Sequence, residues 1–511
     1  MNLTISRANK AILVPPISGA QSLFSAAPKL PDGNLVVPHD LQTTLLLRHL
    51  GFNCPNPMLY YYDWVGGKPF AVQRATCDMM TTNRRAYVLN HMGTGKTKTT
   101  LWAWDYLNRS GCAKKLLVVA PLSTLHFVWA REAFATLPHR RVRVLHGTKQ
   151  NRLDRLAEDA DIYIINHDGL KVIESELQCR ADIDTLVLDE LAVYRNNSDR
   201  SKRMRKFAAK FNIAWGLTGA PMPNEPTDVW AQCMILTPHT VPKFRKHAQH
   251  MLMTQVTQFV WKPKPDAIER AFNMMQPSVR YSLDDVVELP DIVSRTIDIP
   301  LSDEQQSTYK RVASEMQAMV KDKKITAVNA GAAMNKLLQI AGGWVYTSNP
   351  EFVRIDPAPR LTALYELIQS AEQKVLVAVP YRHMIEGISR ILEMVKIDHC
   401  TVHGDTKERE KIFHLFQNSD KYKVMLAHPA CVHHGLTLTA ADTLIWYLPI
   451  TSLDVYDQFN ARFRRIGQKH KQQLIHLQGA PVEKKIYKML REHQKLQDLF
   501  LQLVENATGD I

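Results

Sequence analysis

Short apolar runs alternate with amphipathic helical stretches in two separate parts of this chain of 511 residues. Apolar runs of this length between helices predict parallel strands, with helices covering both faces of each sheet. The expected strands of the first part are Ala86–Leu89, Leu116–Ala120, Arg143–Leu145, Ile162–Ile165, Thr185–Leu188 and Ile213–Leu217. Those of the second part are Lys374–Val379, His399–Val402, Lys423–Leu426 and Thr443–Tyr447. The sequence therefore predicts an α/β fold with two doubly wound parallel-sheet lobes.

The regions outside these two parts have a different pattern. Residues 1–65 carry frequent prolines, which suit short strands and turns around one helix, roughly Leu41–Leu50. Between about residues 240 and 350 the alternation fades and helical stretches dominate. A chain of this length is also too long for a single ordinary core. We predict a small N-terminal accessory domain at 1–65, a first lobe at 66–240, a linker with helical protrusions at 241–355, a second lobe at 356–480 and a C-terminal helix at 481–511.

The composition is that of a globular protein, with 45% hydrophobic and 22% charged residues. No apolar run approaches the roughly 20 residues that a membrane-spanning helix needs. The first residues, MNLTISRANK, lack the apolar core of a signal peptide. The seven cysteines are scattered singly, and none forms a CxxC pair. We therefore expect no membrane association and a reducing, intracellular location rather than a disulfide scaffold.

The formal net charge of +14 favours a polyanionic partner, most simply nucleic acid. The positive charge is spread along the chain, with local concentrations at Lys202–Lys210, Lys243–His247 and Lys321–Lys324. Each of these runs is equally compatible with a solvated helix face. The charge therefore indicates a class of partner but not a site.

A glycine loop joins the first expected strand to a helix. Ala86–Leu89 runs into Asn90-His-Met-Gly-Thr-Gly-Lys-Thr97, and a helical stretch follows through Leu107. Glycines let backbone N–H groups approach phosphate oxygens, and the helix N-terminus adds its positive dipole end. Lys96 can reach the β- and γ-phosphates, and the Thr97 hydroxyl can ligate Mg²⁺. Asn90 stands where the usual loop pattern has its first glycine. The predicted nucleotide-binding residues of the loop are Met92, Gly93, Thr94, Gly95, Lys96 and Thr97.

Two carboxylates follow the apolar run Thr185–Leu188. Ligand sites of parallel sheets lie at the carboxyl ends of the strands, so this pair is expected near the glycine loop. Asp189 is predicted to hold Mg²⁺, and Glu190 to orient and activate the attacking water. Upstream of the loop, the side-chain amide of Gln73 can donate to and accept from an adenine edge. The sequence thus predicts ATP and Mg²⁺ as cofactors.

The order of these motifs resembles that of superfamily 2 helicases. Five stretches carry the resemblance: Pro69…Gln73, MGTGKT (92–97), VVAPLSTLHFVWAREA (118–133), VLDE (187–190) and LTGAPMPNEPTDVW (217–230). The Trp129/Glu132 spacing and the block 218–224 resemble the Snf-type, chromatin-remodeller-like ATPases in particular. The resemblance implies two RecA-like lobes that clamp ATP between them. The family usually has Asp-Glu-Ala-His, whereas Leu191 and Ala192 follow Glu190 here. This departure concerns the coupling between the nucleotide site and the next motif, rather than hydrolysis.

The resemblance continues through the second part, so that the motifs cover about residues 66–470. The stretch DQFNARFRRIGQ (457–468) is similar to the family's sixth motif. We expect it to form a helix ending near Gly467, with Gln458, Arg462 and Arg465 at i, i+4 and i+7 on one face. The resemblance implies that Gln458 contacts the nucleotide and that both arginines approach the γ-phosphate. Arg464 lies off that face and is expected to complement the helix dipole.

Contacts to the DNA backbone are also implied by family motif positions, namely Ser123, Thr124, His403, Gly404 and Thr437. We predict no metal site at the cluster of His428, Cys431, His433 and His434. Adjacent residues in an extended strand or tight loop point apart, and no second ligand pair lies at a spacing typical of zinc. Similarity to the family's fifth motif accounts for the same stretch.

The N-terminal unit offers two interpretations. Leu35–Pro38, Leu45–Gly51 and Tyr62-Asp63-Trp64 resemble, over a short length, the HARP-type module of annealing helicases and the corresponding region of compact phage and bacterial relatives. The alternative is a packing extension that braces the first lobe. The aromatic run Tyr60–Trp64 could stack on bases, whereas aromatic residues at a domain seam are more often buried.

The prediction is an ATP- and Mg²⁺-dependent motor that translocates on double-stranded DNA and remodels branched or annealing DNA or DNA-bound complexes. DNA binding should be sequence-independent. We expect a cytoplasmic monomer in a bacterial or phage-infected cell, with partners from replication, recombination, repair or transcription. Three alternatives remain: a strand-separating DNA or RNA helicase, although no inserted wedge hairpin is evident; a motor acting on RNA polymerase; and a non-catalytic DNA-binding scaffold, against which the intact catalytic set argues.

Overall fold

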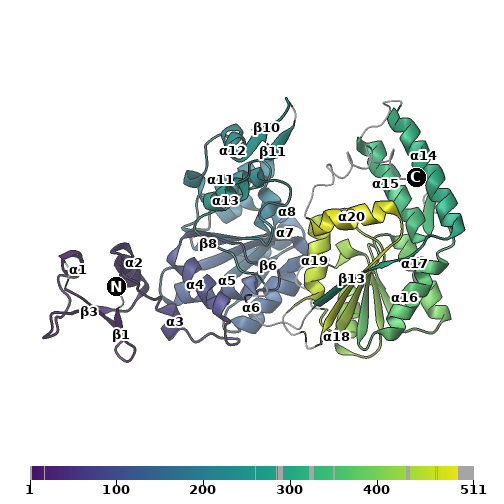
Figure 1. Cartoon of the computed structure of the whole chain (residues 1–511). Helices are drawn as coiled ribbons and strands as arrows, with labels where there is room; N and C mark the ends of the chain where they lie inside the picture. Colours follow the sequence, from purple (N-terminus) through teal and green to yellow (C-terminus); the bar gives the residue numbers. More distant parts are fainter. Residues whose placement is uncertain are drawn as a thin grey trace. The chain divides into compact units, whose positions relative to one another are not determined.

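The computed structural model describes residues 3–16, 18–258, 260–282, 285, 292–321, 327–348, 351–432, 438–465, 468 and 470–492. It contains two compact units, Met1–Val286 and Val287–Ile511, coloured from purple to teal and from teal-green to yellow in Figure 1. Among these described residues, no helix combines the length and the apolar character needed to cross a membrane.

The first unit begins with a three-stranded antiparallel sheet of β1 (Thr4–Ser6), β2 (Ala11–Val14) and β3 (Leu35–Pro38). Helix α1 (Ser18–Leu23) joins β2 to β3. Helix α2 (Leu41–His49) begins after Asp40, whose carboxylate accepts the Thr43 N–H, a standard N-cap. Short strands and turns with a helix near residues 41–50 were predicted, and the structure confirms them.

The aromatic run after α3 (Met58–Tyr61) packs against the first lobe. The Tyr62 hydroxyl donates to Asp105 at 2.8 Å, and Trp64 meets Trp102 edge-on with ring centroids 5.3 Å apart. Tyr62 is buried and Trp64 partly buried. These two rings therefore brace the first lobe, as the packing interpretation predicted, and do not present open faces to bases.

The first lobe holds a seven-stranded sheet in the order β12-β4-β9-β8-β5-β7-β6, with every neighbouring pair parallel. Successive residues of β5 face opposite sides: Leu116, Val118 and Ala120 join one core cluster, and Leu117 and Val119 join the other. Such a strand is apolar throughout because helices cover both faces. The strands are β4 (Arg85–Val88), β5 (Lys115–Ala120), β6 (Val142–Leu145), β7 (Ile162–Asn166), β8 (Ile183–Asp189), β9 (Ile213–Leu217) and β12 (Ser278–Val279). The helices are α4 (Ala71–Thr82), α5 (Lys96–Arg109), α6 (Arg131–Thr136), α7 (Lys149–Ala157), α8 (His167–Leu170), α9 (Glu174–Gln178), α10 (Asp199–Ala208) and α11 (Val229–Leu236).

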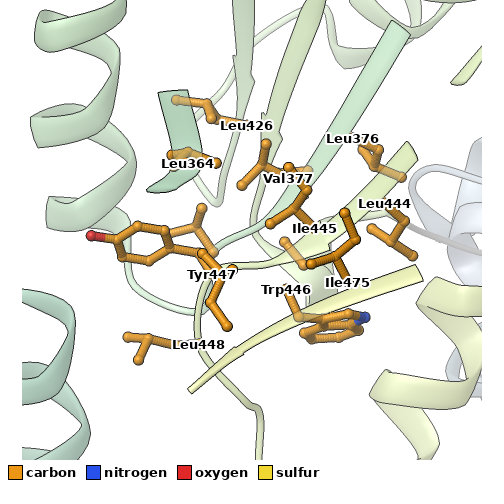
Figure 2. Close-up of a cluster of buried hydrophobic side chains, with 14 of the residues drawn as sticks. Leu364, Leu376, Val377, Leu426, Leu444, Ile445, Trp446, Tyr447, Leu448 and Ile475 are labelled. Atoms are coloured by element: carbon orange, nitrogen blue, oxygen red, sulfur yellow. The ribbon is translucent and has the colours of Figure 1, made fainter. Parts of the chain in front are cut away.

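The second unit holds a six-stranded, all-parallel sheet in the order β13-β20-β19-β16-β18-β17. Figure 2 shows part of its core, where Leu376, Ile445 and Ile475 from three neighbouring strands lie close together. The strands are β13 (Ile292–Asp298), β16 (Lys374–Ala378), β17 (His399–Val402), β18 (Val424–Ala427), β19 (Ala441–Trp446) and β20 (Gln472–Gln478). The helices are α16 (Ala358–Ser370), α17 (Arg382–Met394), α18 (Arg409–Asn418), α19 (Leu453–Phe463) and α20 (Pro481–Arg491). The predicted α/β fold with two doubly wound parallel sheets is confirmed.

The segment between the lobes is more than a set of helices. It forms the expected helices α12 (Arg245–Leu252), α13 (Ala267–Met274), α14 (Asp303–Lys321) and α15 (Ala327–Gly342). It also forms two antiparallel hairpins, β10 (Met253–Gln255) with β11 (Trp261–Pro263), and β14 (Trp344–Ser348) with β15 (Glu351–Arg354). Strand β12 lies in the first sheet and β13 in the second, although both were assigned to the linker. Their outer positions explain the miss, because an edge strand needs fewer apolar residues than a central one.

Candidate nucleotide-binding site

The loop between β4 and α5 has the backbone geometry of a phosphate cradle. Gly93 and Gly95 have φ values of 83° and 82°, a left-handed conformation that glycine adopts at no steric cost. No side chain caps the N-terminus of α5, the end at which a helix favours an anion. The Lys96 ammonium donates to the carbonyl oxygens of Asn90 at 2.8 Å and His91 at 3.2 Å. The cation is thereby held on the loop that carries the predicted phosphate contacts.

Gln73 on α4 holds this loop in place. Its Nε2 donates to the Thr94 carbonyl at 3.1 Å, and its Oε1 accepts the Phe70 N–H at 3.1 Å. A Cβ atom on Gly95 would lie 2.3 Å from the same amide nitrogen, so only glycine fits beneath it. The amide is thus bonded to backbone at both ends in the described conformation, and its contact with adenine stays a prediction.

Asn90, the departure from the usual loop pattern, is a structural tie. Its side chain is buried, with Nδ2 donating to Thr76 Oγ1 at 3.1 Å and Oδ1 accepting the Tyr281 N–H at 3.0 Å. It therefore connects α4 and the segment after β12 to the start of the loop. In the sequence, Asn90 stands out only as the residue in the place of the usual first glycine. A buried amide directly after an apolar strand was the signal that could have marked it.

The predicted carboxylates lie at the carboxyl end of β8. In the sheet order, β9 separates β8 from β4, and all three strands run parallel, so Asp189 and the glycine loop occupy the same edge. Asp189 Oδ1 accepts the Glu190 N–H at 3.1 Å, and Oδ2 accepts the Trp129 indole N–H at 2.8 Å. Glu190 has φ 51° and ψ 55°, a left-handed conformation that costs a non-glycine residue on the order of 1–3 kcal/mol. Strain of this kind concentrates at functional positions.

The loop after β9 lies against the phosphate loop. The Thr218 N–H donates to the Val88 carbonyl at 3.1 Å. A Cβ on Gly219 would lie 3.6 Å from the Asn90 oxygen and from Met92 atoms. The structure therefore brings together, in one lobe, the glycine loop, the β8 carboxylates and the segment 218–224.

Leu191 and Ala192 stand where the family usually has Ala-His, and Ala192, in the histidine position, is partly buried. Leu191 is buried beneath β9, where a Cβ on Gly216 would meet its Cδ2 at 2.5 Å. A different histidine, His167 at the end of β7, lies nearby in the lobe and shares a 2.8 Å hydrogen bond with the Tyr194 hydroxyl. Burial lowers the pKa of His167 to about 4, so its ring is neutral at physiological pH. The sequence prediction did not single out this buried pair.

The candidate DNA contacts differ in accessibility. Ser123 is partly exposed, whereas Thr124 is buried and its hydroxyl donates to the Pro121 carbonyl at 2.9 Å. In the second unit, the His403 N–H donates to Thr406 Oγ1 at 2.9 Å, and burial lowers the pKa of its ring. Gly404 is exposed, and its carbonyl accepts from Arg409. Thr437 lies outside the described residues.

The arginine motif is not one continuous helix. Helix α19 ends at Phe463, and Arg464 follows with φ −87° and ψ 96°. The Arg462 and Phe463 carbonyls accept the Leu438 N–H at 3.2 Å and the Gln472 amide at 2.9 Å, which replace the bonds that a further turn would make. Gly467, the predicted helix end, lies outside the described residues. The prediction of a shared face is therefore wrong for Arg465, which follows the helix, and holds for Gln458 and Arg462 only.

Accessibility also separates the arginines. Arg462 is buried, while Gln458, Arg464 and Arg465 are all partly exposed. Gln468 is buried and donates to the Ala441 carbonyl at 2.9 Å.

No group of three or more metal-ligating side chains gathers in the described part of the chain. His428 is partly buried, and burial lowers the pKa of its ring. His433 and His434 lie outside the described residues, so the decision against a zinc site at this cluster stays a prediction.

Two families of known proteins match the chain. The SNF2-related domain matches residues 77–344, more than half of the sequence, and the helicase conserved C-terminal domain matches residues 359–467. The chain belongs to the SNF2 family. This confirms the predicted family and the prediction of an ATP-hydrolysing enzyme of the helicase class.

Individual relatives of this SNF2-family chain are distant. It is 26% identical over 421 residues to protein p41 of Acyrthosiphon pisum secondary endosymbiont phage 1, covering 77% of this chain and 87% of p41. It is 23% identical over 418 residues to the uncharacterized ATP-dependent helicase MG018 of Mycoplasma genitalium, covering 80% of this chain and 39% of MG018. The SWI2/SNF2 ATPase core of Sulfolobus solfataricus in complex with dsDNA aligns with 88% of this chain and 94% of its own, at 21% identity and a TM-score of 0.42.

The SNF2 family implies a nucleotide and, as a rule, Mg²⁺, and the residues of this lobe fit both. The left-handed glycines and the uncapped start of α5 suit phosphate oxygens. A carboxylate and a hydroxyl, Asp189 and Thr97, are oxygen ligands of the kind that Mg²⁺ prefers. The roles of the individual residues remain predictions.

Proposed function

We propose that this SNF2-family chain is an ATP- and Mg²⁺-dependent motor that translocates along double-stranded DNA and thereby remodels branched DNA or DNA-bound complexes. The observation that supports it best is the meeting, at one sheet edge, of the β4–α5 glycine loop with the Asp189 and Glu190 carboxylates. The family membership and the net charge of +14 agree with a nucleic-acid substrate.

Each residue of the first lobe has a distinct part in the proposed hydrolysis. The loop N–H groups and Lys96 bind the phosphates, with the ammonium leaving the Asn90 and His91 carbonyls for the nucleotide. Thr97 and Asp189 would hold Mg²⁺, which when bound neutralises charge on the phosphate oxygens. Glu190 orients the attacking water and takes up its proton. The left-handed backbone of Glu190 agrees with a functional role at this position.

The second lobe is proposed to supply cations to the γ-phosphate. Arg465 is partly exposed beyond the end of α19 and is the better candidate for a contact made on lobe closure. Arg462 is buried within the structure and is proposed to fix the geometry of the motif as well as to bind phosphate. A contact that forms only in the closed state couples hydrolysis to movement of the lobes.

DNA is proposed to be bound mainly through its phosphates. Ser123 in the first lobe and His403 and Gly404 in the second are candidate contacts, through side chains and backbone rather than base edges. Binding of this kind is independent of sequence and weakens steeply as salt rises. An intact catalytic set also argues against a purely structural scaffold.

A triplex-displacement experiment tests translocation directly. The chain is incubated with ATP and a duplex that carries a short third strand in its major groove, and release of the third strand is followed by gel electrophoresis. The proposal expects release that requires ATP and is lost in Lys96→Ala. Duplex-stimulated ATP hydrolysis without any release would overturn the translocase assignment while leaving the ATPase intact.

One observation favours a second candidate, a strand-separating helicase. The β10–β11 hairpin, which the sequence did not reveal, exposes Val256 and Val260 at 54% and 47%. Lys262 and Lys264 stand on its second strand and just beyond it. Exposed valines at a hairpin can act as an apolar wedge between base steps, with Lys262 near the backbone. This candidate expects ATP-dependent release of one strand from a forked duplex. Val256→Asp should reduce that release and leave triplex displacement unaffected.

A further inference from the structure

The buried Trp129 side chain is bonded to the predicted metal ligand. Its indole Nε1 donates to Asp189 Oδ2 at 2.8 Å, and the ring itself is fully buried in the core cluster on one face of the first sheet. The other Asp189 oxygen accepts the Glu190 N–H. Both carboxylate oxygens are thus oriented by protein donors.

Trp129 belongs to an unusual segment. Residues Leu122–Thr124 form a 3₁₀ turn, and Leu125–Ala130 follow as a single π-helical turn before α6. Isolated π turns are rare and occur frequently at functional sites, because the widened turn is held by its surroundings rather than by ideal backbone bonding.

The opposite side of this segment faces solvent. Leu122 and Phe127 are exposed at 57% and 47%, and Ser123, the candidate DNA contact, lies between them in sequence. Exposed aromatic and apolar side chains next to a phosphate-binding hydroxyl suit contact with a nucleic-acid backbone and its sugars. One short segment therefore carries a candidate DNA surface outside and a bond to the metal ligand inside.

We propose that Trp129 is a positioning residue that links DNA contact at residues 122–127 to the orientation of the Asp189 carboxylate. The inference rests on the proposed function, in which Asp189 holds Mg²⁺ and DNA stimulates hydrolysis. A charge-assisted bond from a rigid indole fixes the carboxylate plane, and a displacement of the π turn moves that donor. DNA binding thus changes how well the site holds Mg²⁺ with its nucleotide.

The neighbouring tryptophans set this bond apart. The indole N–H groups of Trp102, Trp215 and Trp230 donate to backbone carbonyls, while that of Trp129 donates to a carboxylate. Trp104, fully buried in the same cluster, makes no indole hydrogen bond within the part of the chain that the structure describes. Trp104→Phe is therefore a matched control for Trp129→Phe, because both remove an indole from one core.

The test compares ADP binding with and without Mg²⁺, using a fluorescent ADP analogue. Wild type and Trp104→Phe should gain the same affinity on adding Mg²⁺. Trp129→Phe should lose about tenfold or more of that gain, because the metal ligand loses the donor that orients it. Its affinity in EDTA should stay unchanged. An equal Mg²⁺-dependent gain in both variants would overturn the proposal.

A second variant changes the solvent-exposed side of residues 122–127 and does not disturb the core. Phe127→Ala should reduce the stimulation of ATP hydrolysis by duplex DNA and leave the Mg²⁺-dependent ADP affinity intact. Full stimulation in Phe127→Ala would overturn the link to DNA. If wild type itself shows no stimulation by nucleic acid, the proposed function fails, whereas the Mg²⁺ comparison of Trp129→Phe still decides the role of the indole.

Discussion

The β4–α5 turn of the first lobe and the β16–α17 turn of the second offer the clearest contrast in the molecule. In the first lobe, β4 leads through a loop with two left-handed glycines to α5, whose first residue is Lys96. In the second, β16 leads through Val379-Pro380-Tyr381 to α17, whose first residue is Arg382. Proline has no N–H to offer an oxyanion. The two turns therefore differ in the backbone N–H donors that they can offer an oxyanion.

The side chains at the two helix starts reinforce that contrast. Lys96 turns back onto the carbonyls of its own loop, where the nucleotide is proposed to bind. Arg382 instead pairs with Glu386 and Asp405 of its own lobe. The β16–α17 turn thus has neither a glycine at residues 379–381 nor an uncommitted lysine, and in the proposed mechanism the second lobe contributes Arg465 to the nucleotide.

The largest expected effect is the loss of ATP hydrolysis when the Lys96 side chain is removed. Lys96→Ala should bring ATP hydrolysis to the background of the assay and weaken nucleotide binding, because the loop loses its cation. Arg382→Ala, the same change at the first residue of α17, should leave nucleotide binding unaltered. Both are measured with a fluorescent ADP analogue and a phosphate-release assay. Equal losses in the two variants would show that the loops do not differ as proposed.

The next effect concerns the second lobe's contribution. Arg465→Ala should slow hydrolysis by roughly 10³–10⁵, the range for removal of an arginine that stabilises transferring phosphate. ATP and DNA binding should be largely retained, since the contact forms in the transition state. Arg464→Ala is the control and should have a much smaller effect on the rate. A loss of ATP affinity as large as the loss of rate would contradict the assignment.

A smaller effect compares the two buried charges that stabilise the lobes. Asp105 in the first lobe accepts from Tyr62, Arg109 and Arg140 at 2.7–2.8 Å. Glu483 in the second pairs with Arg360 at 2.8 Å. Replacing either carboxylate with alanine should destabilise its own lobe by about 3–5 kcal/mol, because Arg360 stays buried without its ion pair, and Tyr62 and Arg140 lose the buried carboxylate that they bond to.

Denaturant unfolding measures each loss of stability, and native-state hydrogen exchange shows which lobe has lost protection. The control is Lys411→Ala, which breaks an exposed pair with Glu408 and should cost no more than about 1 kcal/mol. If Asp105→Ala lowered protection in the second lobe as much as in the first, the two cores would not be independent.

The smallest effect contrasts two glycines. Gly95→Ala places a methyl group against the Gln73 amide at a left-handed position, so it should cost stability and nucleotide affinity. Gly331→Ala in α15 meets nothing within 4 Å and should stabilise the second lobe by roughly 0.5–1 kcal/mol through helix propensity. Thermal unfolding of both variants measures the difference. Opposite signs are expected, and two losses would mean that α15 depends on Gly331.

The sequence predicted the parts of the site that are encoded locally. An apolar strand, a glycine loop and a helix start occupy one short stretch, and Asp189 follows its strand directly. Such patterns depend on neighbours in sequence, so they can be recognised without the fold. The central strands of both sheets were found for the same reason.

The features that were missed depend on contacts between distant segments. Helix α19 ends early because Leu438 and Gln472 bond to its last carbonyls, which no local pattern shows. Strand β13 is polar and at an edge, and it is defined by pairing with β20 about 180 residues later. The bond from Trp129 to Asp189 likewise joins residues 60 positions apart.

The central claim is that nucleic acid drives ATP hydrolysis at the β4–α5 loop. The most direct measurement is the rate of ATP hydrolysis with no nucleic acid, single strands, duplex and forked DNA, each at saturation. We expect duplex or forked DNA to raise the rate by about tenfold or more, equivalent to at least about 1.4 kcal/mol of the barrier, and more than single strands do. A rate that no nucleic acid changes would contradict the account.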